Sequence, residues 1–179
     1  MNPSAVIDFW FLEMSPAQRF KKDAGIDQLI ASRFADIHRC ASACELQHWR
    51  DTPQGALAEI LLLDQFSRNM FRDTPRAFEF DNLALALSQE LVRRGQDAKL
   101  PVEQRGFAYM PYMHSESTLI HELAVELFNQ PGLEEQYRYE LRHKEIIDRF
   151  GRYPHRNVIL QRESTAEELQ FLQMPGSGF

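Results

Sequence analysis

The chain has 179 residues, of which 44% are hydrophobic and 26% are charged, and its formal net charge is −6 when His is neutral. These ordinary values exclude collagen-like and disordered chains, two cysteines exclude a disulfide framework, and no stretch reaches the ~20 apolar residues of a membrane-spanning helix. The acidic balance also disfavours nonspecific binding to nucleic acids and anionic membranes.

Residue usage favours helices over strands. Twenty Leu and 16 Ala stand against 18 Val, Ile and Thr combined, and β-branched residues are the preferred strand formers. The first helix signals are Pro3 and Pro16, each of which follows a capping side chain. Apolar spacings of three and four predict an amphipathic helix over about 23–46. Thr52-Pro53 then begins a helix that runs to about residue 72, and a fourth ends near residue 94 with Gly95 as its C′ residue.

The second half of the chain continues this pattern. Pro101 and Pro111 are expected to bracket a short helical piece, and a further helix is expected from His114 to Gln130. Another helix covers 133–150 and closes at Gly151, and a capping box of Ser164 and Glu167 begins the last one. The prediction is one all-α domain over 1–179, with seven to nine helices packed as antiparallel hairpins.

The N-terminal segment 1–14 contains Asp8 and Glu13 and no basic residue, so it lacks the pattern of a secretory signal. Cys40 and Cys44 match neither a C-x-x-C redox motif nor a zinc pair, and we interpret them as reduced, half-buried side chains. A cytoplasmic location is the expectation from these two features.

The helix over 53–72 is apolar nearly all round, which is typical of a central helix. At 100° per residue, Asp64 falls inside an apolar sector, and Arg68 lies one turn further on. A buried carboxylate needs a partner. Two interpretations remain open: an internal Asp64–Arg68 ion pair that orients helices, or a carboxylate and the guanidinium groups of Arg68 and Arg72 directed into a cleft. Gln65 and Asn69 lie elsewhere on the helix and are expected to support neighbouring helices.

Two further polar residues occupy positions where apolar ones are expected. Glu116 begins the stripe that continues through Leu119 and Leu123, and His114 lies beside it. His143 falls on the apolar face of its helix, as a core histidine or as a site residue. The loop that follows is dense in functional groups, which favours a site: Arg152, His155, Arg156 and Asn157. His38 and His48 show no partner pattern and are expected at the surface.

Three segments carry a family resemblance: Leu-Leu-Asp64-Gln-Phe-Ser-Arg68-Asn-Met-Phe-Arg72, Pro-Tyr-Met-His114-Ser-Glu116, and the run from Arg142-His143 to Asn157. In these motifs, and across essentially its whole length, the chain resembles the bacterial DUF924 family. The resemblance implies an all-helical, tetratricopeptide-repeat-like fold and no assigned reaction. It also marks a departure, because this chain has Gln161 where the family usually has Gly after Asn-Val-Ile-Leu, so a different turn is expected there.

The leading functional hypothesis is a polar cleft that binds an anionic small molecule, a phosphorylated or carboxylated metabolite. The predicted catalytic residues, which would exchange protons, are Asp64, His114, Glu116 and His143. The predicted ligand-binding residues are Arg68, Arg72, Arg152, His155, Arg156 and Asn157. No cofactor and no metal is predicted. A metal variant built on His114, Glu116, His143 and His155 ranks lower, because the spacing matches no ligand motif and nearby Arg side chains repel a cation.

The alternative hypothesis is a protein-interaction module, because tetratricopeptide-like arrays usually function in protein binding. It expects an exposed groove for a peptide or protein partner, with Asp64 and His143 as structural residues. Nucleic-acid binding ranks third and rests on the local net charge of +4 between Arg138 and Arg162.

Overall fold

The computed structural model describes residues 2–178, and within this range the chain forms helices and no strand. The bounds of the α-helices are α1 Pro3–Asp8, α2 Pro16–Phe20, α3 Ala24–Ser42, α4 Pro53–Leu61, α5 Ser67–Met70, α6 Asp81–Arg93, α7 Val102–Met113, α8 Thr118–Phe128, α9 Glu134–Phe150 and α10 Ala166–Phe171. Short 3-10 helices lie between several of them, among them η4 Pro75–Phe78 and η6 Pro154–Arg156. The all-α prediction is confirmed.

Two segments have π-helical hydrogen bonding. The first, η1 Phe9–Glu13, extends α1, and the second, η3 Leu62–Phe66, joins α4 to α5. Because α4, η3 and α5 are continuous, the helix predicted over 53–72 exists nearly in full. If these three segments are counted as one helix, the ten α-helices of residues 2–178 become nine. π-Turns inserted into α-helices are uncommon and often lie at functional sites.

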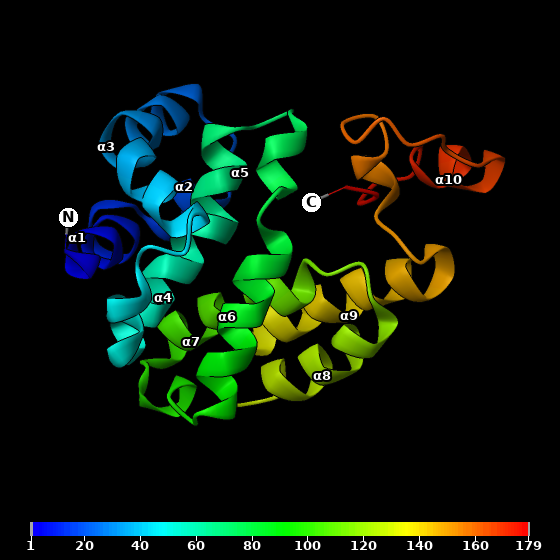
Figure 1. Cartoon of the computed structure of the whole chain (residues 1–179). Helices are drawn as coiled ribbons and strands as arrows, with labels where there is room; N and C mark the ends of the chain where they lie inside the picture. The colour runs from blue at the N-terminus through cyan, green and yellow to red at the C-terminus, as the bar shows by residue number, and fades with distance from the viewer. Residues whose placement is uncertain (1, 179) are drawn as a thin grey trace.

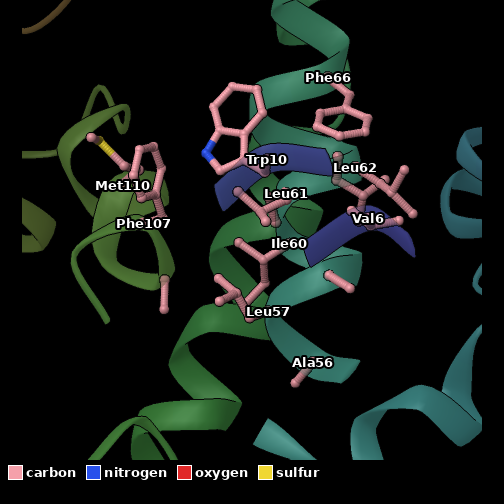
Figure 2. Close-up of a cluster of buried hydrophobic side chains, with 14 of the residues drawn as sticks. Val6, Trp10, Ala56, Leu57, Ile60, Leu61, Leu62, Phe66, Phe107 and Met110 are labelled. Atoms are coloured by element: carbon pink, nitrogen blue, oxygen red, sulfur yellow. The ribbon is translucent and has the colours of Figure 1, made fainter. Parts of the chain in front are cut away.

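The central position predicted for the helix over 53–72 is confirmed. Every residue of η3 is buried, as are the α4 residues from Gly55 to Leu61. α4 packs against α1, α6 and α7. Figure 2 shows this core, with Trp10 between Phe66 and the side chains of α7. The consecutive pairs α6–α7, α7–α8 and α8–α9 also pack together, which fits a tetratricopeptide-like array.

The chain after α9 forms a separate edge of the molecule. In Figure 1 this segment lies on the opposite side of the view from α1 to α3. It begins at Gly151, which ends α9 in the left-handed conformation with a φ of 67°, as predicted. A small second cluster of buried apolar side chains lies here, formed by Ile146, Ile147 and Tyr153 with Phe150 and Phe171 against them.

Several local predictions require correction. His38 is buried, with 4% of its surface exposed, because its Nε2 bonds the Ser67 hydroxyl at 2.8 Å and its ring packs between Phe71 and Phe80. The last capping box is Thr165 with Glu168, one residue later than predicted.

The helices around Pro111 also differ from the prediction. Pro111 lies inside α7 instead of after it, and α8 begins at Thr118 instead of at His114. Leu119 and Leu123 are exposed, because the face of α8 that packs inward is rotated to His121, Ala124 and Phe128.

Gln161 adopts a φ of 55°, which is the left-handed region that glycine reaches without steric cost. The turn is closed by the amide of Arg162, which donates to the carbonyl of Asn157 at 2.8 Å. A glycine-type backbone conformation is therefore kept at this position although the side chain is Gln.

Candidate functional site

Asp64 is fully buried, with 0% of its surface exposed. It lies in the π segment η3, and its carboxylate is fully engaged. Oδ1 accepts from His114 Nδ1 at 2.6 Å and faces Arg68 Nη1 at 3.1 Å, and Oδ2 accepts from the Gln65 amide at 2.6 Å. Burial opposes ionisation, but Arg68 and His114 outweigh it and hold the pKa of Asp64 below its ordinary value. The predicted Asp64–Arg68 pair is confirmed, with His114 as a third member.

His114 follows the last residue of α7 and closes that helix through its amide, which donates to the Met110 carbonyl. Burial and the charge of Arg68 lower the pKa of its imidazole, although Asp64 acts in the opposite direction. The ring is therefore neutral at pH 7, and its Nδ1 hydrogen is donated to the ionised Asp64. This tautomer leaves Nε2 as an unprotonated base.

Arg68 and Arg156 both approach one carboxylate, that of Asp81 at the start of α6. Arg68 chelates it with two bonds of 2.8 and 2.9 Å, whereas Arg156 reaches it only at 3.4 Å. Phe78 lies beside both cations, with its ring centre 5.6 Å from the Arg68 guanidinium carbon and 4.7 Å from that of Arg156. Asp81 is thus shared unequally, and Arg156 is the less well neutralised cation.

Arg156 also contacts the backbone of His114. Its Nη2 donates to the His114 carbonyl at 3.0 Å, and its Nε is buried without a hydrogen-bond partner. Burial, followed by repulsion from Arg68, lowers the pKa of this guanidinium. The lowered pKa indicates that the carboxylates near Arg156 do not fully compensate its buried positive charge.

A pocket of about 250 Å³ opens at this point, between the η4–α6 junction, the end of α7 and the η6 segment. The side chains that form its apolar walls are Pro75, Phe78, Leu85, Pro111 and Leu160. The polar side chains that line it are Glu79, Asp81, Asn82, His114, Ser115, Glu116 and Arg156. Asp64 and Arg68 lie directly behind His114 and Asp81, so residues far apart in the sequence converge at one pocket.

Glu116 lines the pocket but mainly holds the C-terminal segment in place. Its two oxygens accept from Arg162 at 2.6 and 2.9 Å, and one of them also accepts the Tyr153 amide at 2.8 Å. Burial works against its ionisation, but the Arg162 and Tyr153 hydrogen bonds prevail and lower the pKa of Glu116. At neutral pH it is a carboxylate, and Arg162 was not predicted as its partner.

Two of the predicted ligand-binding arginines are ion-paired away from the pocket. Arg72 chelates Asp27 of α3 at 2.7 and 2.8 Å, and Asn69 donates to the same carboxylate, which confirms that Asn69 supports a neighbouring helix. Arg152 chelates Glu168 of α10 at 2.6 and 2.8 Å.

Asn157 is also part of the C-terminal segment and is fully buried. Its amide nitrogen donates to Ser164 and Glu168, and its carbonyl oxygen accepts from Arg162. These contacts connect the residues on either side of the turn at Gln161.

His143 and His155 gather around the ring of Tyr153, whose centre lies 5.6 and 5.5 Å from theirs. The Nδ1 hydrogen of His143 is donated to the Tyr139 carbonyl at 2.8 Å. Burial lowers the pKa of His143 to about 3 and that of His155 to about 4, so both rings are neutral at pH 7. Neither residue lines the pocket at His114.

A second histidine–carboxylate pair, between His121 of α8 and Glu140 of α9, was not predicted. His121 Nδ1 and Glu140 Oε1 are 2.6 Å apart, and both side chains are fully buried. His121 Nε2 lies 2.9 Å from the Ser115 carbonyl and 3.2 Å from the Tyr153 hydroxyl. The signal was present in the sequence, because His121 shares a helical face with Ala124 and Phe128.

Over residues 2–178, no group of three or more His, Cys, Asp or Glu side chains is placed to hold a metal ion, so the metal variant gains no support from geometry. Within the same range, no helix has the length and apolarity needed to cross a membrane.

Comparison with known proteins places the chain among proteins without an assigned reaction. A search of curated proteins gives no match. A solved structure described as a protein of unknown function, ATU0120 from Agrobacterium tumefaciens, is 40% identical, with 96% of each chain covered and a TM-score of 0.91. The model of the family described as "Bacterial protein of unknown function (DUF924)" matches residues 6–176. The chain therefore belongs to the DUF924 family.

Proposed function

We propose that the pocket beside His114 binds a small anionic metabolite and that His114 accepts a proton there. The observation that carries this proposal is the 2.6 Å contact between Nδ1 of His114, which lines an open pocket, and Oδ1 of the buried Asp64. A buried carboxylate that fixes the tautomer of a histidine is a recurrent way to prepare a general base.

The positions of the protons in the Asp64–His114 pair support this role. Asp64 stays ionised next to Arg68, so the Nδ1 hydrogen of His114 is fixed and Nε2 is left to accept a proton. Asp64 then stabilises the imidazolium that forms, without taking the proton itself. Because the imidazole is neutral at pH 7, its base form is the populated one.

The proposed anion site is Arg156, with Arg68 behind it. Asp81 is already chelated by Arg68, and its distance to Arg156 is 3.4 Å, so a ligand carboxylate or phosphate would supply charge that Arg156 lacks. A pocket of about 250 Å³ lies below the ~300–1,000 Å³ typical of drug-sized ligands, which favours a compact metabolite.

The remaining predicted site residues receive other parts in this proposal. Glu116 keeps the C-terminal wall of the pocket in place through Arg162 and Tyr153. His143 and His155 pack around Tyr153. Arg72, Arg152 and Asn157 hold helices and the C-terminal segment together.

Binding of simple anions tests the proposal. Inorganic phosphate, succinate and phosphoenolpyruvate would be titrated into the full chain and followed by calorimetry and by NMR of the His114 ring. At least one probe should bind and raise the pKa of His114, because a bound anion favours the imidazolium. Arg156→Gln should weaken that binding by about 10-fold or more, as expected for the loss of a charge-assisted hydrogen bond.

Arg72→Gln is the matched control, since Arg72 also forms a two-bond pair with a carboxylate but lies outside the pocket. It should leave probe binding unchanged. Absence of binding by all three probes, or equal weakening by both variants, would overturn the proposal. The interaction-module alternative expects that absence together with affinity for an extended peptide.

A further inference from the structure

The pocket at His114 carries two charges of opposite sign that its own side chains leave poorly compensated. Of its three carboxylates, Asp81 is chelated by Arg68 and Glu116 by Arg162. The charges that remain are the guanidinium of Arg156 and the carboxylate of Glu79.

Glu79 differs from the other two carboxylates in its surroundings. Its nearest ion-pair partner is Arg76, with Oε2 and Nε separated by 3.8 Å, and both side chains are more than half exposed. The Arg76 guanidinium instead lies over the ring of Phe71, 3.9 Å from its centre. Exposed pairs of this kind contribute little, so the Glu79 carboxylate remains available to a ligand cation.

From this imbalance we infer that the ligand is a zwitterion, a small molecule that carries an ammonium group as well as its acidic group. The inference rests on the proposed anion site and adds a second contact, from the ligand ammonium to Glu79, while Arg156 takes the acid. A purely anionic ligand would meet the like charge of Glu79 without compensation.

The lining between the charged groups suggests what joins the two ends of the ligand. Apolar side chains from four parts of the chain form the walls, namely Pro75 and Phe78, Leu85, Pro111 and Leu160. Methylene groups would bury apolar surface against these walls, whereas a hydroxylated linker would lose hydrogen bonds to water. The ligand class is therefore an amino acid or amino phosphate with a short aliphatic spacer.

Matched pairs of acids test this inference. β-Alanine and propionate, 4-aminobutyrate and butyrate, and 5-aminovalerate and valerate would each be titrated into the full chain at pH 7, with dissociation constants measured by NMR. The spacer varies along the series, and the ammonium group is the only change of charge within each pair. At least one amino acid should bind about 10-fold more tightly than its amine-free partner.

Glu79→Gln should reduce that ratio to near one and leave the affinity of the amine-free acid unchanged or higher. Glu90→Gln is the matched control, because Glu90 also pairs with an exposed arginine three residues away and does not line this pocket. It should keep the wild-type ratio.

The outcomes separate the two proposals. If the acids bind and the ammonium group adds nothing in any pair, or if Glu79→Gln keeps the ratio, the zwitterion inference is wrong and the anion site stands. If neither member of any pair binds, the zwitterion inference is wrong, and the titrations with phosphate, succinate and phosphoenolpyruvate decide whether the anion site stands. If the ratio is as expected but Arg156→Gln leaves butyrate affinity unchanged, the acid does not bind at Arg156 and the anion site is wrong.

Discussion

Two histidine–carboxylate pairs of the same length behave as opposites in this fold. In both, Nδ1 of the histidine lies 2.6 Å from a buried carboxyl oxygen. His114 lines the pocket and Asp64 lies behind it, whereas His121 and Glu140 are sealed between α8 and α9 with no exposed surface. Identical contact geometry therefore does not decide what such a pair does.

The charge near the carboxyl group sets the first difference. Arg68 lies 3.1 Å from Asp64 and helps to lower the pKa of that carboxyl. Burial raises the pKa of Glu140, and although His121 and Lys144 oppose this, the ammonium of Lys144 is paired with Asp148 at 2.6 Å. A neighbouring guanidinium therefore helps to lower the pKa of one carboxyl, and without such a neighbour burial raises the pKa of the other.

The second difference lies at the far nitrogen of each ring. His121 Nε2 must carry a hydrogen, because its partner at 2.9 Å is the Ser115 carbonyl, which can only accept. Because burial raises the pKa of Glu140, we expect the proton between the two groups to lie on the Glu140 carboxyl, which makes that pair neutral and closed. His114 has the opposite tautomer and presents a bare Nε2. One pair connects two helices, and the other is prepared to accept a proton.

The largest expected effect is that of Asp64→Asn. The substitution removes the charge that faces Arg68 and fixes His114, so it leaves a buried cation undercompensated. We expect a loss of about 3–5 kcal/mol in the free energy of unfolding, measured by urea denaturation. Asp27→Asn is the control, since that aspartate also pairs with an arginine but is more exposed. A loss of under ~1 kcal/mol for Asp64→Asn would show that the pair is not needed by the fold.

In the closed pair, the corresponding substitution is Glu140→Gln. At pH 4 it should lower the free energy of unfolding by no more than ~1 kcal/mol, because the amide nitrogen of Gln can donate to His121 Nδ1 as a protonated carboxyl does. Above pH ~4.3 the unfolded carboxyl ionises while the folded one keeps its proton, so wild-type stability falls by up to ~1.4 kcal/mol per pH unit until the raised folded pKa is passed. Glu140→Gln lacks this decline. Urea denaturation from pH 4 to 7 should show the variant gaining on wild type, and a variant that instead loses ground would mean that Glu140 is ionised in the fold.

The comparison also shows what a single sequence can predict. The burial of Asp64 and His143 followed from helical spacing, because the faces of one helix are set by local geometry. α8 has apolar residues on more than one face, so spacing alone selected Leu119 and Leu123 and missed His121. The face of α8 that packs inward is the one that contacts α7 and α9, and these contacts cannot be read from the spacing within α8.

The ion-pair partners of the arginines lay beyond such local rules. Arg72 was predicted to bind a ligand, but its partner Asp27 comes from 45 residues earlier in the chain. Arg152 pairs with Glu168, which is 16 residues later. A charged side chain on a predicted inner face thus indicates that a counter-charge is needed, and only the fold shows whether the protein supplies it. At Arg156 the protein supplies it incompletely, which is why the ligand site is proposed there.

The last and smallest expected difference is not one of stability. It is the position of the ring hydrogen in His114 and in His121. Long-range ¹H–¹⁵N spectra at pH 7 should show His114 with a protonated Nδ1 and a bare Nε2, and His121 with a protonated Nε2 and a bare Nδ1. His48, which is exposed, gives the reference pattern of a ring without a fixed tautomer. If both buried rings showed the Nε2–H form, Asp64 would not orient His114 as a base. If His121 were doubly protonated, the closed pair would be ionic, and the guanidinium of Arg68 would not be what distinguishes the two sites.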